Sequence, residues 1–97
     1  MQVYMATGRL TKDPVLSYTD KAKCKFFIAT EVRRGSFKRT DFIPCVAWKE
    51  LAEIIANYTK KGSLVSIKGE LRSHMQDLPD GSKRMHLELE VMECDFL

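Results

Sequence analysis

The sequence predicts an all-β fold, a five-stranded barrel with one α-helix between strands 3 and 4. Most of the chain alternates apolar and polar residues, with the two-residue period of half-buried strands. One stretch, which begins at Glu50, changes to apolar residues spaced three and four apart, as an amphipathic helix requires. No linker, internal repeat or low-complexity stretch separates these segments. We therefore expect one domain over residues 1–97.

The first two strands are expected on either side of one loop. Residues 1–10 form the first strand, with Gly8 at a bulge or bend where a small barrel must curve. Residues 11–20 contain Pro14 and several turn formers, which predicts the loop. Residues 21–32 form the second strand. Its inward side chains are predicted to be Cys24, Phe26, Ile28 and Val32, and its outward ones Lys23, Lys25, Phe27 and Glu31.

The third strand, residues 42–48, follows a hairpin that turns at Gly35 and Ser36. One face of this strand carries Ile43, Cys45 and Ala47, and the other carries Phe42, Pro44, Val46 and Trp48. Two large aromatic residues on the face that points away from the core expose apolar surface. Phe42 and Trp48 are therefore expected to be covered by something or to bind something.

The helix is predicted to end at Lys60, Lys61 and Gly62. Cations suit the last turn of a helix, and glycine can adopt the left-handed conformation that ends it. Its apolar stripe consists of Leu51, Ile54, Ile55 and Tyr58.

The last two strands are predicted to follow the helix and to be joined by a loop. The fourth strand runs to Arg72, residues 73–82 form the loop with a turn at residues 79–81, and residues 84–96 form the fifth strand. The inward side chains of the fifth strand are predicted to be Met85, Leu87, Leu89 and Val91.

Composition indicates a soluble globular chain of the cytoplasm. The chain is 44% hydrophobic and 30% charged, and no apolar run approaches the roughly 20 residues of a membrane span. Residues 1–10 lack the basic start and apolar stretch of a signal peptide. Three cysteines, Cys24, Cys45 and Cys94, lie far apart without a C-x-x-C pair, which favours buried free thiols in a reducing compartment.

The net charge of +3 is too small to identify a partner, but its distribution is informative. The link between the second and third strands carries Arg33, Arg34, Lys38 and Arg39 beside Phe37. A base can stack on an aromatic ring while neighbouring cations hold phosphates, so this pattern is typical of a single-strand site. A solvated hairpin tip is the alternative. Residues 88–95 contain four acids and no base, and would repel phosphates.

Two outward aromatic residues have an alternative interpretation. Phe27, beside Lys25, is placed on the outer face by alternation alone, and a subunit contact or partial burial would explain it equally well. Trp48 could pack over the start of the helix, since tryptophan is usually well buried.

No catalytic constellation is present, so we expect neither an enzyme nor a metal or cofactor site. The two histidines, His74 and His86, have no H-E-x-x-H or C-x-x-C partner. Phosphate-binding glycine loops and serine nucleophile motifs are absent. A metal-dependent nuclease would need carboxylates clustered at one end of the barrel, and their spacing does not indicate such a cluster.

The order of several motifs resembles the bacterial single-stranded DNA-binding protein family. These motifs are GRLTKDP at residues 8–14, Tyr18, FIAT at residues 27–30, and AW followed by LAEIIANYTKKGSLVSIKGELR up to Arg72. The resemblance covers nearly the whole chain. It implies an oligonucleotide-binding barrel (OB-fold) that holds single-stranded DNA in replication, recombination or repair.

The resemblance also implies site residues. Phe42 and Trp48 match aromatic stacking positions of the family, and Lys61 and Arg72 match basic positions. Other family aromatics are replaced here, by an arginine near Arg33 or Arg34, by Gln76 and by Met85, which reduces stacking. Arginine can stack through its planar guanidinium, so part of that loss is recovered.

The expected partners are single-stranded DNA, a second copy of the chain, and replication or recombination proteins. Apolar residues 3–7 predict a homo-oligomer, a tetramer by resemblance and a dimer otherwise. Family members usually continue into a flexible segment with an acidic tip. Because this sequence ends at Leu97, we expect a tail-less or trimmed member. The alternative function is that of a primosome-type assembly factor, which mainly bridges proteins and binds DNA weakly.

Overall fold

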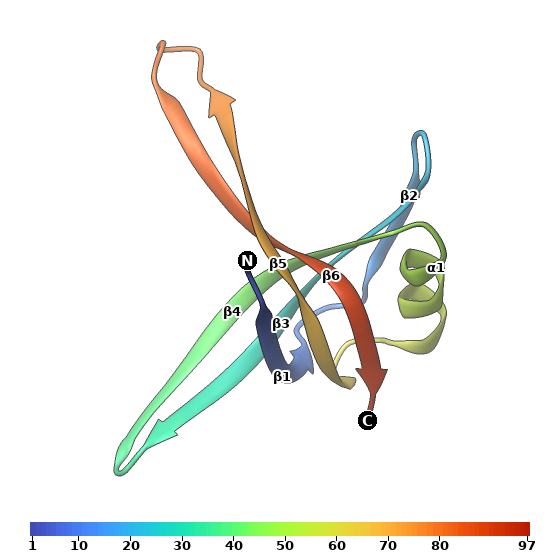
Figure 1. Ribbon diagram of the computed structural model, residues 1–97, viewed down its shortest axis with the longest axis vertical. Coiled ribbons are helices and arrows are strands. Elements are labelled where there is room, and N and C mark those ends of the chain that lie inside the picture. The colour runs from blue at the N-terminus through green and yellow to red at the C-terminus, as the bar shows by residue number, and fades with distance from the viewer.

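Five long strands close into a barrel in the computed structural model, which describes residues 1–97 (Figure 1). The elements are β1 (Tyr4–Leu10), β2 (Val15–Tyr18), β3 (Ala22–Arg34), β4 (Phe37–Trp48), α1 (Lys49–Tyr58), β5 (Leu64–Asp77) and β6 (Lys83–Phe96). The pairing order is β1-β5-β6-β4-β3, and a β1–β3 pairing closes the barrel. All pairs are antiparallel except β4–β6. Helix α1 lies between the third and fourth long strands, so the predicted OB-fold is confirmed.

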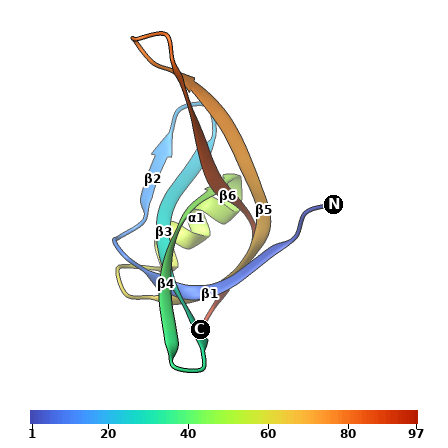
Figure 2. The same ribbon diagram turned by 90° about the vertical axis from the view of Figure 1, so that its left-hand side faces the viewer.

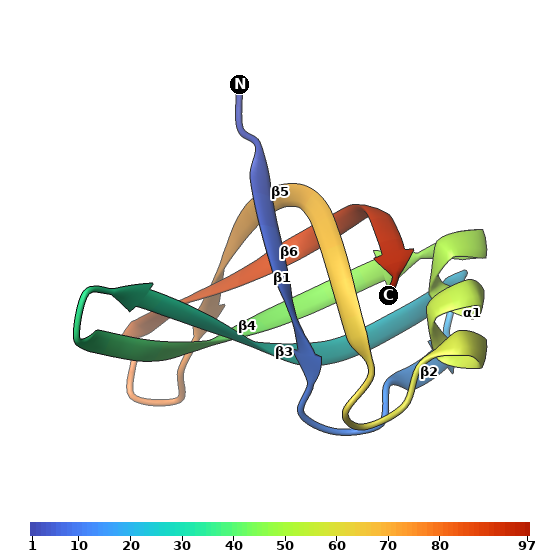
Figure 3. The ribbon, with the colours of Figure 1, turned by 90° about the horizontal axis from the view of Figure 1, so that it is seen from below.

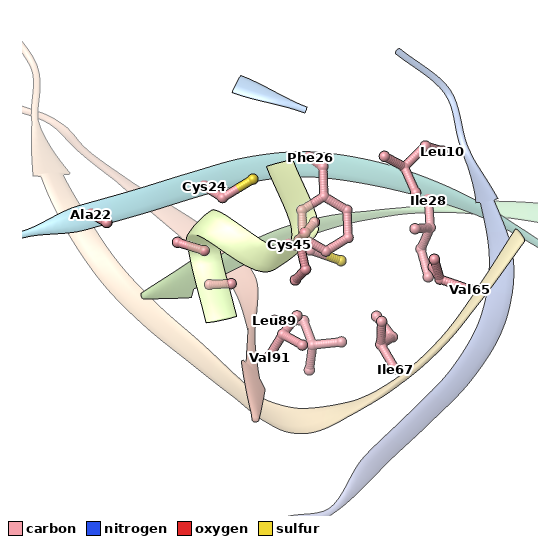
Figure 4. Packing of buried hydrophobic residues seen from close by; sticks show 13 residues of the cluster. Leu10, Ala22, Cys24, Phe26, Ile28, Cys45, Val65, Ile67, Leu89 and Val91 are labelled. Atoms are coloured by element: carbon pink, nitrogen blue, oxygen red, sulfur yellow. The ribbon is translucent and has the colours of Figure 1, made fainter. Parts of the chain in front are cut away.

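The core lies inside the barrel and under α1 (Figure 4). Within the barrel, alternate residues of the long strands point into it, as predicted for Cys24, Phe26 and Ile28. Val32, also predicted to face inward, lies on the β3–β4 hairpin and does not belong to the core cluster. Helix α1 contributes Ala52 and Ile55. Burial of a side chain as large as leucine or isoleucine contributes about 1.5 to 3 kcal/mol, so this cluster dominates the stability of the barrel.

Gly69 marks the place where two backbones approach most closely. It lies beside a register shift in the β5–β6 pairing, and a Cβ atom added there would overlap the carbonyl group of Glu90. A bulge of this kind bends a strand sharply, which a small closed barrel requires. Only glycine fits this position.

Two hairpin arms extend beyond the barrel: the outer part of β3–β4 and the outer part of β5–β6 (Figures 1 and 2). The prediction of a loop over residues 73–82 was wrong in its first half. Residues 73–77 continue β5 because they pair with residues 83–87 of β6, and only residues 78–82 turn. Met85 and Leu87 were predicted to face the core but are 58% and 50% exposed. They lie on this arm, where no element covers them.

The predicted loop over residues 11–20 contains a strand. Residues of β2 pair with β3 from Val15↔Lys25 to Tyr18↔Ala22, on the outer edge of the sheet. The sequence did not reveal β2 because turn-forming residues surround it. This strand forms because it hydrogen-bonds to β3, and not because its own residues favour an extended conformation.

Helix α1 ends earlier than predicted. The backbone N–H of Thr59 donates to the carbonyl oxygen of Ile55, and no cation lies in the last turn. Gly62 does take a left-handed φ of 90°, but in the turn that follows. Two residues of the predicted apolar stripe, Ile54 and Tyr58, are exposed. No helix of the structure has the length and apolar character needed to cross a membrane.

Candidate nucleic-acid interface

The register of β3 and β4 gathers the outward aromatic residues on one face. Residues directly opposite each other in an antiparallel pair share a face. The pairs Phe27↔Pro44 and Ala29↔Phe42 therefore put Phe27 and Phe42 side by side, and Lys23↔Trp48 continues the row. Phe27 is 48% exposed and Phe42 is 64% exposed. Along β4, Phe42 and Trp48 are roughly 20 Å apart, at about 3.3 Å per residue, which is enough for each ring to hold a different base.

Two pockets lie between this face and the β5–β6 arm. Figure 3 shows the ribbons of β3, β4, β5 and β6 from below. One pocket of about 310 Å³ is lined by Lys21, Trp48, Arg72 and His74, among others. A second pocket of about 660 Å³ contains Lys25, Phe27 and His74. The two pockets share His74 and Glu88, so they adjoin each other, and we call them together the groove.

Val46 forms part of the floor of the groove. Its side chain points outward from β4, as predicted, yet Val46 is only 2% exposed and does not belong to the core cluster. The ion pair of Arg72 Nη1 with Glu90 Oε2, 2.8 Å long, lines the same pocket. Arg72 therefore lies beside Trp48, where a phosphate could compete with Glu90 for its guanidinium.

Trp48 is half-buried at the junction of β4 and α1. Lys21 Nζ lies 4.7 Å and Lys23 Nζ 5.1 Å from the centroid of its ring. The next residue, Lys49, has a φ of 59°, a conformation that non-glycine residues rarely adopt, so the chain turns abruptly after the tryptophan. Sequence reasoning did not select Lys21 and Lys23. The signal was the alternation Lys-Ala-Lys-Cys-Lys, which places Lys23 and Lys25 on one face of β3 and Lys21 just before this strand.

The basic hairpin is divided between two faces. The pair Arg33↔Lys38 lies on the face of Phe27 and Phe42, whereas Arg34↔Phe37 and Val32↔Arg39 lie on the opposite face. The predicted cluster of cations around Phe37 is therefore two smaller groups. Only Arg33 and Lys38 continue the row that starts at Trp48.

Acids flank the hairpin and neutralise part of its charge. Glu31 Oε1 accepts a hydrogen bond from Arg33 Nε at 2.7 Å and lies 3.5 Å from Lys38 Nζ. The hydrogen bond from Arg33, with the charge of Lys38, lowers the pKa of the Glu31 carboxyl. Arg39 Nε pairs with Asp41 Oδ2 at 3.1 Å. These exposed ion pairs can be exchanged for phosphates at little cost.

Lys61 lies outside the groove. It follows α1, and its backbone N–H donates to Asp13 Oδ1 at 2.8 Å. Its side chain lines neither of the two groove pockets, so the structure does not bring Lys61 together with Trp48 and Arg72.

The arm contributes groove residues that sequence reasoning did not select. His74 and His86 stack with ring centroids 5.1 Å apart, and His86 Nε2 lies 2.7 Å from Gln76 Oε1. Glu88 and Glu90 bring part of the acidic segment into the groove. Pairing of the arm strands creates this arrangement, so local sequence alone does not reveal it.

The cysteines provide no reactive group. Burial raises the pKa of Cys24 to about 11 and, together with the charge of Cys94, that of Cys45 to about 12. Burial, followed by the nearby Asp95, raises the pKa of Cys94 to about 11. All three thiols are free and stay protonated at neutral pH. No group of three or more His, Cys, Asp or Glu side chains is placed to hold a metal ion.

Comparison with known proteins identifies the family of the chain. The family model for the Single-strand binding protein family matches residues 1–97. The chain belongs to the single-strand binding protein family. Single-stranded DNA-binding protein 2 of Clostridium acetobutylicum is 40% identical over 95 residues, which cover 93% of this chain and 71% of that protein.

Two further relatives of the single-strand binding protein family are similar over the same share of the chain. The single-stranded DNA-binding protein of Caldanaerobacter subterraneus subsp. tengcongensis is 42% identical over 95 residues, covering 93% of this chain and 63% of the relative. Single-stranded DNA-binding protein A of Bacillus subtilis is 37% identical, covering 93% and 55%. The chain thus spans between about half and three quarters of the length of these relatives.

Proposed function

We propose that this member of the single-strand binding protein family binds and protects single-stranded DNA with little sequence specificity, in DNA replication, recombination or repair. The observation that carries the proposal is the row of Phe27, Phe42 and Trp48 on one outer face, in and beside a groove that also holds Lys21, Lys25 and Arg72. Stacking holds the bases on the rings, and the cations hold the phosphates.

The same geometry supports binding without sequence specificity. An aromatic ring stacks on any base, because every base has a π-face. A sequence-reading protein would need donors and acceptors aimed at base edges, such as arginine or asparagine side chains in a groove of duplex DNA. The groove instead combines the rings of Phe27 and Trp48 with the cations Lys21, Lys25 and Arg72, and it also contains the acids Glu88 and Glu90.

We expect the protein to bind single-stranded oligonucleotides far more tightly than duplex, because stacked bases in a duplex do not offer their faces to the rings. Competition of labelled oligo(dT) with unlabelled duplex of the same length measures this preference. Mixed-sequence single strands serve as the control and should compete nearly as well as oligo(dT). Equal affinity for duplex and single strand would contradict the proposed function.

The hairpin offers a test with a matched control. Replacing Arg33 and Lys38 by glutamine should flatten the dependence of oligo(dT) affinity on salt, by a slope of about 0.7 per lost phosphate contact. Replacing Arg34 and Arg39 removes the same charge from the opposite face and should change the slope little. Each pair of changes also leaves one acid without a partner, Glu31 or Asp41. An unchanged slope in both variants would make the hairpin a solvated tip.

We also propose a homo-oligomer, a tetramer in line with the family resemblance or else a dimer. Residues 4–6 of β1 pair with β5 on one side only, so their other backbone edge is open. Val3 and Met5 are 60% and 69% exposed beside it. An open edge with apolar neighbours favours pairing with a second chain. Light scattering is expected to give a multiple of 11.2 kDa at micromolar concentration, and a monomer alone would contradict the proposal.

Replication or recombination proteins are further proposed partners, in the cytoplasm and on chromosomal DNA, because single strands arise during these processes. The support for this step is membership of the family and not a docking site on the barrel.

A further inference from the structure

The ring of Trp48 is already occupied in the protein without DNA. Lys21 and Lys23 both place their ammonium groups over it, at 4.7 and 5.1 Å from the centroid. A cation within about 6 Å of an indole is attracted by its negative face. A base that stacks on a face covered by one of these ammonium groups must displace that lysine.

These two lysines have no other partner. Neither Lys21 nor Lys23 forms an ion pair with an acid, in contrast to Arg33, Lys38 and Arg39 of the hairpin. Glu90 shares the pocket of Lys21 but is held by Arg72. Once displaced from the ring, each ammonium group is therefore free to bind an anion.

The spacing of the lysines suits a phosphate backbone. Lys23 and Lys25 project from one face of β3, about 6.6 Å apart in an extended strand, and Lys21 lies in the bend just before β3 begins at Ala22. Lys23 lies directly opposite Trp48 in the β3–β4 register. Lys21 lines the pocket of Trp48, whereas Lys25 lines the adjoining pocket with Phe27. A strand whose bases lie on the aromatic residues would thus run its phosphates along these lysines.

We propose that Lys21 and Lys23 cap Trp48 in the free protein and move to successive phosphates of the single strand when a base takes their place on the ring. This inference rests on the proposed function and adds two residues and an exchange step to it. The exchange is favourable because a cation over an exposed ring is bound more weakly than a stacked base, and the released lysine gains a phosphate.

The test compares Lys21→Met, Lys23→Met and the double variant with Lys68→Met. Lys68 is an exposed lysine of β5 that lines neither groove pocket. Lys68→Met therefore removes one positive charge, as each single variant does, but it removes no contact with the Trp48 ring. Affinity for oligo(dT) is measured across salt concentrations, and the emission of Trp48, the only tryptophan, reports on the ring. A second ligand, an abasic oligomer of equal length, supplies phosphates without bases.

The slope of log affinity against log salt concentration should be smaller by about 1.4 in the double variant. The loss of oligo(dT) affinity relative to the natural protein should therefore be about sevenfold larger at 50 mM than at 200 mM salt. Quenching by saturating oligo(dT) should persist in it, because Trp48 remains. The abasic oligomer should change the emission of the natural protein by drawing the lysines off the ring, and should leave that of the double variant unchanged.

Two outcomes would overturn the exchange. If the double variant had the same salt slope as Lys68→Met and its fluorescence were still quenched, the two lysines would only pack against the ring. Tighter binding of the double variant at every salt concentration would mean that they only compete with the base. Absence of binding and quenching in the natural protein is a different result, which would refute the proposed function itself.

Discussion

Replacing Trp48 with alanine is expected to weaken binding of oligo(dT) by about 1 to 3 kcal/mol, a loss of about 5-fold to about 150-fold. The ring lines the same pocket as Lys21 and Arg72, and no phenylalanine, tyrosine or second tryptophan lines that pocket. Titration of the natural protein with oligo(dT) should also quench its fluorescence, because Trp48 is the only tryptophan. Affinity and thermal melting of the variant are measured together.

Tyr58→Ala is the matched control for Trp48→Ala. Tyr58 is an aromatic residue of α1 that is 73% exposed and lines no groove pocket; its ring contacts Phe96 with centroids 6.0 Å apart. Removal of this ring should leave oligo(dT) affinity unchanged. If Trp48→Ala melted earlier while binding as the natural protein does, Trp48 would be a packing residue. Phe42, Phe27 and the cations would then carry the site.

Gly69→Ala is expected to lower the free energy of unfolding by about 3 kcal/mol, at the upper end of what overpacking usually costs. The added methyl group would overlap the carbonyl oxygen of Glu90 and lie 2.9 Å from its carbonyl carbon. Backbone atoms cannot rotate away as a side chain can, so β5 and β6 would have to separate at the bulge that closes the barrel. Urea denaturation followed by circular dichroism measures the change.

Gly81→Ala separates this steric effect from backbone strain. Gly81 has a φ of 87°, but an added Cβ would meet nothing within 4 Å. Its cost should therefore be that of a left-handed alanine, about 1 kcal/mol. Equal losses in the two variants would show that the contact with Glu90 is not what excludes a side chain at Gly69.

Periodicity was sufficient to predict the barrel part of the fold. Alternation along β3 and β4 identified the inward Cys24, Phe26 and Cys45, because a buried strand face has one partner, the core, and must be apolar throughout. The same rule failed for Met85 and Leu87. Alternation says which face a residue is on, but it does not say whether that face is covered.

The site was predicted in part for the same reason. Phe27, Phe42, Trp48 and Lys25 are outward residues of two paired strands, so alternation and a hairpin turn were enough to place them on one face. The division of the basic hairpin depends on which residue of β3 opposes which residue of β4. A shift of one residue would have put Arg34, not Arg33, on the face that carries Phe42 and Lys38.

The sequence by itself determined the succession of the five long strands along the chain, the single helix and the outward aromatic residues, because each follows from local periodicity and from the turns that interrupt it. Only the tertiary structure decided that the β5–β6 arm stands over the face of β3 and β4, so that Arg72 and His74 share a pocket with Trp48. It also decided that Lys21 and Lys23 cover the indole ring. These contacts join segments more than 20 residues apart in the chain, and they depend on how far the barrel twists before it closes, which no local pattern encodes.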